Sequence, residues 1–216
     1  VIAPSLAWFG RDTSVRMSYE HTDYGQPFDR GTVIDSRTGR PVAIDRRERL
    51  DEAYNRTLGD SDFFTVQAQH SLNSQWKLNA AYSYNRTKIL HVIDNPPELS
   101  SLNVTLFGRQ AQRDLVAATP RSKVVLSGNW SLDKVRALLR VTQFGKYTES
   151  SNVAASDRTV VARWGTDAER GYQLTDNLDW ALGANNLFGG YPEKNGAIAA
   201  DGSGQFGGFA PFGLSG

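Results

Sequence analysis

The chain has 216 residues, and its 24 Lys and Arg nearly balance its 23 Asp and Glu, so the net charge of +1 indicates no nucleic-acid partner. It contains no cysteine, which excludes a disulfide framework, thiol catalysis and cysteine-based zinc sites. Aromatic residues make up 11% of the chain, although its mean hydropathy is only -0.45. This combination is typical of transmembrane barrels, in which only alternate strand residues face lipid.

Helical membrane spans are not expected, because no segment approaches the roughly 18 to 20 apolar residues that a spanning helix needs. Residues 1–9 also lack the basic segment that opens a signal peptide. A secreted barrel loses its signal on maturation, so this second absence is compatible with export.

Apolar and polar residues alternate along seven segments, which predicts strands with one apolar and one polar face. In the first segment the apolar positions are Val15, Met17 and Tyr19. The other segments are residues 64–69, 76–85, 124–130, 135–141, 160–164 and 178–185. Helical spacing is confined to residues 46–54 and 110–118, where we expect two short helices.

The connections between these strands alternate strictly between short and long. The short ones are residues 10–12, 72–75, 131–134 and 174–177. The long ones are approximately residues 25–62, 88–122, 148–158 and 187–211. Strict alternation places every long connection at the same end of the sheet. Outer-membrane barrels have this arrangement, with short periplasmic turns and long extracellular loops.

Strand length supports the same fold. A tilted transmembrane strand needs about 9 to 11 residues, which residues 75–87 and 135–147 supply. The expected fold is therefore all-β: an antiparallel up-and-down transmembrane barrel, or a fragment of one, of about 9 to 10 strands. Residues 1–216 form a single barrel domain in this interpretation.

The placement of aromatic and charged residues predicts where lipid and water lie. Aromatic residues gather near strand ends, as the interfacial girdles of a membrane barrel do; they are Trp76, Tyr82, Tyr84, Trp130 and Tyr147. Charged residues occupy the polar phase of the strands, where they avoid the cost of about 2 to 4 kcal/mol at the lipid midplane. The candidate ligand-binding residues of the lumen and loops are Arg16, Glu20, Arg136, Arg140, Arg163 and Tyr147.

Several segments resemble TonB-dependent outer-membrane receptors of the ferri-siderophore type. The early part of that family's barrel is similar to residues 19–24, 28–32, 46–49, 54–57 and 59–62, and the later part to residues 84–88, 106–109 and 118–123. The most specific match is Leu182-Gly183-Ala184-Asn185-Asn186-Leu187-Phe188, followed by Tyr191-Pro192. Residues 211–213 then resemble the beginning of the closing strand. The resemblance implies uptake of ferric siderophores across the outer membrane and no enzymatic activity. It implies a transported ferric siderophore as ligand and no bound cofactor.

The sequence also departs from that family, whose barrels have 22 strands. It shows neither the N-terminal plug nor the TonB-box segment through which TonB acts, and we count about nine strands. Features of the early and late barrel stand side by side, which predicts a join between about residues 62 and 84 and an absent middle block. We therefore expect a shortened barrel wall that contacts TonB only through a plug not present in this sequence.

Other motifs favour no separate chemistry. Residues 202–207 match G-x-G-x-x-G, but residues typical of loops flank them, where a dinucleotide site needs a strand and a helix. His21, His70 and His91 show no metal-ligand spacing. The arginine-rich residues 37–49 fit a solvated loop, or a loop that attracts an anionic siderophore or lipopolysaccharide phosphate.

The expected partners are outer-membrane lipid and lipopolysaccharide, with no nucleic acid, and a monomeric state. Two alternatives remain open at this point. One is a passive outer-membrane pore or a receptor for heme, another metal or a sugar. The other is a soluble β-sandwich binding module.

Overall fold

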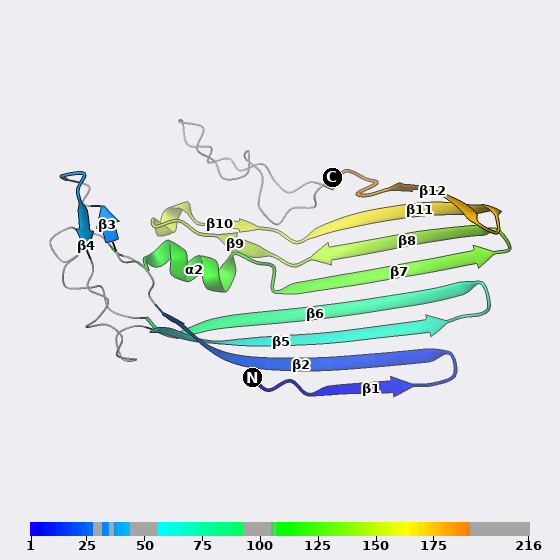
Figure 1. Cartoon of the computed structure of the whole chain (residues 1–216), viewed down its shortest axis with the longest axis horizontal. Coiled ribbons are helices and arrows are strands. Elements are labelled where there is room, and N and C mark those ends of the chain that lie inside the picture. Colours follow the sequence, from blue (N-terminus) through cyan, green and yellow to red (C-terminus); the bar gives the residue numbers. More distant parts are fainter. Residues whose placement is uncertain (28–31, 35–36, 44–55, 93–104, 106, 191–216) are drawn as a thin grey trace.

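A computed structural model describes residues 1–27, 32–34, 37–43, 56–92, 105 and 107–190. Its main feature is one eight-stranded sheet in which each strand lies beside its sequence neighbours (Figure 1). All pairs in this sheet are antiparallel, so the chain runs up and down. The strands in order are β1 (Ser5–Phe9), β2 (Thr13–Pro27), β5 (Arg56–Ser71), β6 (Trp76–His91), β7 (Ser122–Leu132), β8 (Val135–Phe144), β11 (Arg163–Thr175) and β12 (Leu178–Ala184).

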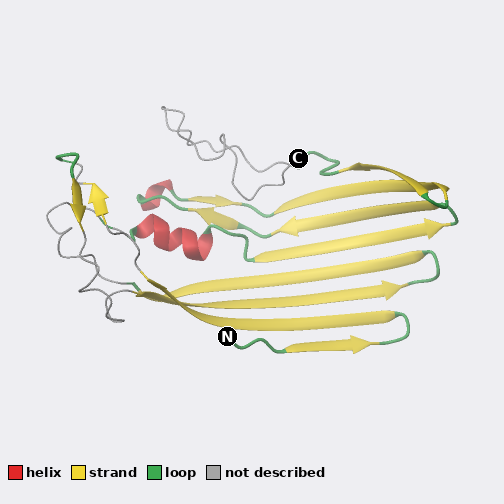
Figure 2. Ribbon diagram, viewed as in Figure 1, coloured by secondary structure: helices red, strands yellow, loops and turns green. Residues whose placement is uncertain are grey.

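The short and long connections lie at opposite ends of this sheet, as the sequence predicts. The four turns at one end include Asp133-Lys134, where Asp133 has a φ of 51°, a left-handed conformation that Asp tolerates in two-residue hairpin loops. In the described part of the chain, the other end carries two hairpins, an α-helix and a 3-10 turn (Figure 2). These are β3 (Thr32–Ile34) with β4 (Pro41–Ala43), β9 (Tyr147–Glu149) with β10 (Arg158–Val160), the helix α2 (Arg109–Ala117) and the 3-10 turn η3 (Ala154–Ser156).

The registers separate the sheet into an apolar and a polar face, because residues paired across antiparallel strands point to the same side. One row of the apolar face joins Tyr19 to Phe64 and Phe64 to Tyr84. Near the short turns, Trp76 pairs with Trp130, and their ring centroids are 6.5 Å apart. Aromatic side chains therefore border the apolar face at both of its ends.

The distance between these aromatic rows fits a lipid bilayer. Trp76 and Tyr84 are eight residues apart on β6, which corresponds to about 26 Å along the strand. At the usual tilt of membrane strands this becomes about 20 Å of depth, close to the apolar band of about 25 Å in outer-membrane barrels. Beyond Tyr84, the next residue of β6 on the same side of the sheet is Arg86, whose partner on β5 is Asp62. The apolar band thus ends where charged side chains begin.

The sheet forms a single layer without a conventional core. Among the described hydrophobic residues, only Tyr147 and Val160 are buried. Large side chains of the apolar face remain exposed, with Leu139 at 53% and Leu182 at 66% of their accessible surface. Within the described residues the sheet is also open, since β1 and β12 are its edges. A face of this kind is stable only against an apolar phase or another protein surface.

The structure refines several boundaries expected from the sequence. The helix predicted at residues 110–118 is confirmed as α2, whereas residues 46–54 and the closing strand at 211–213 lie outside the described residues. β8 ends at Phe144, so the strand expected over residues 135–147 is shorter. The single strand expected over residues 160–164 is wrong, because β10 ends at Val160 and β11 begins at Arg163. Eight of the expected 9 to 10 strands of the sheet lie within the described residues.

Within the same part of the chain, no helix has both the length and the apolar character needed to cross a membrane.

Candidate functional site

The polar face of the sheet carries most of the candidate ligand-binding residues. The registers place Arg16 opposite Gln67, Arg140 opposite Ser127 and Arg163 opposite Phe144. The pairing across the sheet places these three arginines on the face opposite the aromatic rows, as the alternation predicts. Glu20 and Arg136 lie on the same face. The structure does not gather them into one cluster, because Arg16 and Glu20 lie on β2, four strands away from β8.

Three strands bring together a set of charges on this polar face, which we call the ion ladder: Arg136, Arg140, Asp167, Glu169 and Asp179. Arg140 donates to Asp167 through Nε and Nη2, each at 2.8 Å. Arg136 pairs with Asp179 and lies 3.9 Å from Glu169. Both arginines are therefore neutralised by neighbouring carboxylates. This arrangement links β8, β11 and β12 and leaves little positive charge to attract an anionic ligand.

Gly171 makes room for the ion ladder. A Cβ atom at this position would lie 2.7 Å from Cγ and 2.5 Å from Nε of Arg136. These atoms are in the middle of the arginine side chain, so any larger residue would displace it. The ladder thus depends on a glycine whose partner on β8 is Arg136 itself.

The remaining candidates occupy different surroundings. Glu20 accepts a hydrogen bond of 3.1 Å from the hydroxyl of Thr22. Tyr147, a candidate of the lumen and loops, lies on β9 opposite Val160, and only 6% of its surface is exposed. The sequence placed Tyr147 wrongly on β8 because the alternation continues across Gly145-Lys146, where the strand has ended.

The region around Tyr147 is a structured unit at the end with long connections. Arg109 of α2 binds Asp157 with two hydrogen bonds, of 2.9 and 2.6 Å. This guanidinium lowers the pKa of Asp157 from 3.8 to about 2. Burial raises the pKa of Glu149 and of Asp114. A hydrogen bond with the Ser150 backbone opposes this rise at Asp114. Sequence reasoning missed the Arg109–Asp157 pair, since its members are 48 positions apart and carry no local pattern.

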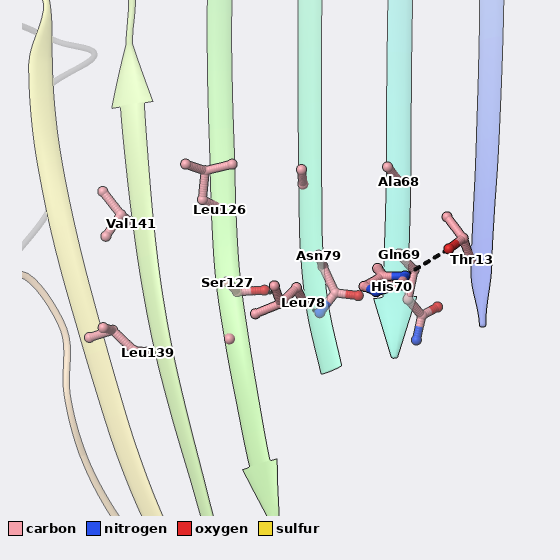
Figure 3. A pocket seen from close by; sticks show the side chains of 12 residues that line it. Thr13, Ala68, Gln69, His70, Leu78, Asn79, Leu126, Ser127, Leu139 and Val141 are labelled. Carbon is pink, nitrogen blue, oxygen red and sulfur yellow. Dashed lines mark hydrogen bonds between the residues drawn. The ribbon is translucent and has the colours of Figure 1, made fainter. Parts of the chain in front are cut away.

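An apolar hollow of about 440 Å³ lies over the centre of the sheet, and Figure 3 shows its lining side chains. Small residues on neighbouring strands create it, because Ala68 pairs with Ala80, and Gly128 on β7 pairs with Leu78. At one side the hydroxyl of Thr13 bonds to Nδ1 of His70 at 2.7 Å. The hollow belongs to the face between the aromatic rows and has almost no polar groups with which to orient a ligand.

His21 lies beside two carboxylates. His21 contacts Asp62 through Nδ1 at 2.9 Å and Asp23 through Nε2 at 3.3 Å, and Tyr19 also donates to Asp62. No three His, Cys, Asp or Glu side chains lie close enough to hold a metal ion in the described ranges of the chain.

The most specific sequence motif has a clear structural role at the end of β12. Asn186 adopts a left-handed φ of 51°, which Asn tolerates better than most residues. Its side chain accepts a hydrogen bond from the Gly190 amide at 2.9 Å, while its own amide donates to Asp167 at 3.0 Å. The amide of Leu187 bonds to the carbonyl of Thr166. The motif therefore ends the strand and ties the following turn to β11.

Comparison with known proteins finds similarity in structure. No protein-family model matches the sequence, and no curated protein matches it either. The copper transporter OprC superposes with a TM-score of 0.57 and 14% identity, over 88% of this chain and 25% of that one. The receptor in the FpvAI–pyocin S2 complex gives a TM-score of 0.53 and 11% identity, over 88% and 24%. The ferripyoverdine receptor of the outer membrane of Pseudomonas aeruginosa gives 0.49 and 12% identity, over 84% and 22%.

These proteins are TonB-dependent receptors, and none of them is an enzyme. The chain spans about a quarter of the length of the structures that it matches. At such low identity the likeness establishes the fold alone. The chain has the fold of a segment of the barrel wall of TonB-dependent receptors, with an antiparallel sheet that is not closed by the strands that the structure describes.

Proposed function

We propose that the chain is part of the wall of an outer-membrane TonB-dependent transporter that takes up ferric siderophores. The observation that carries this proposal is the two-faced sheet. Its apolar face is bordered by aromatic rows at a spacing suited to a bilayer, and its polar face holds the ion ladder. The similarity in fold to TonB-dependent receptors supports the same proposal.

In this proposal the apolar face contacts lipid and the polar face lines the lumen. The short turns face the periplasm, and the end with α2 and the β9–β10 hairpin faces the exterior, in contact with lipopolysaccharide. The assembled receptor is a monomer that contacts TonB through its plug. The predicted join between about residues 62 and 84 falls on the β5–β6 hairpin, and it stays a prediction.

The cargo rests on sequence resemblance. The segment from Leu182 to Pro192 resembles the penultimate barrel strand of ferri-siderophore receptors, and its described part forms the β12 turn that closes on Asp167. Long loops would capture the chelate, and the polar lumen would receive it. Arg136 and Arg140 serve mainly to hold the wall together, because carboxylates already neutralise them.

A second candidate is a receptor of the same fold with a different cargo, such as another metal. The similarity to a copper transporter favours it. Polar lumen residues would be shared by both candidates, whereas the chemistry of the loops would differ. A test of the cargo must therefore compare metals directly.

Two experiments test the proposal. For the membrane wall, the purified chain should require detergent and should migrate differently on gels before and after heating. A monodisperse monomer without detergent would contradict the wall. For the cargo, cells lacking the whole receptor should grow poorly under iron limitation on ferric siderophore and normally under copper limitation. The reverse pattern would favour the second candidate, and growth unaffected by either limitation would contradict both.

A further inference from the structure

A cationic pocket lies between β6 and α2, at the end of the sheet with the long connections. Its volume is about 500 Å³. Among the residues that the structure describes, its lining includes no acidic side chain and five basic ones: Arg86, Lys88, Arg109, Arg113 and Arg121. None of the ligand-binding candidates derived from the sequence belongs to it.

The topology creates this pocket because β6 is longer than its neighbour. β7 begins at Ser122, opposite Tyr84, and the last backbone hydrogen bond between the two segments runs from the Asn85 amide to the Arg121 carbonyl at 2.8 Å. Beyond this point α2 lies beside β6 in place of a strand (Figure 1). Arg109 and Arg113 are one helical turn apart, so both reach the crevice.

Two of the five cations have carboxylate partners. Lys88 lies 3.2 Å from Asp60, and Arg109 is held by Asp157. No ion pair is found for Arg86, Arg113 or Arg121 among the residues that the structure describes. Like charges this close repel each other, so an anion in the pocket would stabilise the arrangement.

Arg86, Arg113 and Arg121 are also accessible. All three are exposed side chains, and one Nη of Arg121 makes only a long hydrogen bond, of 3.4 Å, to the Val116 carbonyl. A guanidinium presents paired donors that match the oxygens of a phosphate group. Three such groups around one cavity suit a phosphate better than a single carboxylate, because a phosphate offers more acceptor oxygens.

We propose that this pocket binds a phosphate-type oxyanion, held by Arg86, Arg113 and Arg121. The position of the pocket along the membrane normal fits the proposal. Arg86 is two residues beyond Tyr84 in the same phase of β6, which places its backbone about 5 Å outside the aromatic row at the usual strand tilt. Phosphates of lipid headgroups and of dissolved molecules both reach this level. The proposal rests on the proposed membrane wall but goes beyond uptake, since it requires no transport.

The first test is a titration of inorganic pyrophosphate into the full chain in neutral detergent micelles, measured by calorimetry. The double variant Arg86→Gln/Arg113→Gln should bind pyrophosphate at least about tenfold more weakly, because charge-assisted bonds are lost. The matched control, Arg11→Gln/Lys134→Gln, removes the same charge from two short turns at the opposite end and should bind as the unmodified chain does. Absence of binding to the unmodified chain, or an equal loss in the control, would overturn the proposal.

The second test identifies the source of the phosphate. Spin-labelled phosphatidic acid and spin-labelled phosphatidylcholine are compared in nanodiscs that contain the full chain. Greater immobilisation of phosphatidic acid, abolished in Arg86→Gln/Arg113→Gln, supports a lipid headgroup. Equal immobilisation together with pyrophosphate binding supports a dissolved phosphate. A preference for phosphatidic acid that survives in the double variant would overturn the site, and far-UV circular dichroism of each variant excludes unfolding as the cause.

Discussion

A charge introduced into the apolar face probes the lipid-facing wall, and Leu126→Arg is the substitution of choice. Leu126 pairs with Ala80 and Val141 in the middle row of that face, and 46% of its surface is exposed. It is four residues from Trp130 in one direction and four from Ser122, the partner of Tyr84, in the other.

These separations place Leu126 near the bilayer midplane. Four residues correspond to about 13 Å along the strand, and at the usual tilt to about 10 Å of depth on each side. An arginine at the midplane of a membrane barrel costs about 2 to 4 kcal/mol. With a urea dependence of about 2 kcal/mol per molar, the unfolding midpoint should fall by about 1 to 2 M.

The assay is reversible urea unfolding in phosphatidylcholine vesicles, followed by tryptophan fluorescence. The matched control is Val125→Arg, one residue away on the polar face, where Val125 pairs with Ala81 and Thr142. Its midpoint should shift by less than half as much, since its guanidinium reaches water. Equal shifts for the two variants, or a larger shift for Val125→Arg, would refute the assignment of the faces.

Three further predictions follow from contacts of individual residues. Gly171→Val should displace Arg136 and destabilise the wall by about 1 to 3 kcal/mol. In a double-mutant cycle with Asp179→Asn, the two losses of stability should be less than additive, because both act on Arg136. Full additivity would argue against the displacement. Asn186→Ala should weaken β12 by about 1 kcal/mol more than Asn186→Gly, because only glycine adopts a positive φ without strain; faster hydrogen exchange of β12 in the alanine variant is the readout, and equal rates would contradict it. The Asp157 carboxylate, whose folded pKa of about 2 lies below its ordinary 3.8, stabilises the α2–hairpin contact above about pH 4, and that stabilisation is lost as the pH falls toward 2. Hydrogen exchange in residues 147–160 should therefore accelerate in this window, and Asp157→Asn should abolish the step; a step that persists in the variant would assign it to another group.

Period-two alternation predicted the faces of the sheet because the pleat of a strand imposes that period on every side chain. Arg136 and Arg140 fall on the polar face, and His21 and His70 on the apolar one, as the pattern predicts. The location of short and long connections at opposite ends of the sheet could also be predicted from the sequence. It follows from strand order alone, which here is the order of the sequence.

Period-two alternation does not predict where strands end or which side chains distant in sequence form pairs. β6 continues to His91 because its hydrogen-bonded ladder with β5 extends past the apolar band, where alternation gives no signal. The three-residue strands of the β9–β10 hairpin are defined by their pairing, so Tyr147 could not be placed there from sequence. The acids of the ion ladder lie 27 or more positions from their arginines, and only the register brings them together.

The cationic pocket was missed for a related reason. Its arginines come from β6, from α2 and from the residue before β7, and no single segment stands out as basic. The signal that could have suggested it is the helical spacing of Arg109 and Arg113, of which Arg113 lies within the helix predicted over residues 110–118 and Arg109 just before it. That Arg86 lies beside them could not be predicted, because it depends on β7 beginning opposite Tyr84.

The measurement that tests the lipid-facing wall most directly is a spin-label scan along β7. Because the chain has no cysteine, single-cysteine variants at each position from Lys123 to Trp130 carry one label each without further changes. In lipid vesicles, accessibility to oxygen should peak at Val124, Leu126 and Gly128, and accessibility to a water-soluble nickel chelate should be lowest at those same positions. A scan without this period of two, or with high nickel accessibility on both faces, would contradict a wall between lipid and lumen.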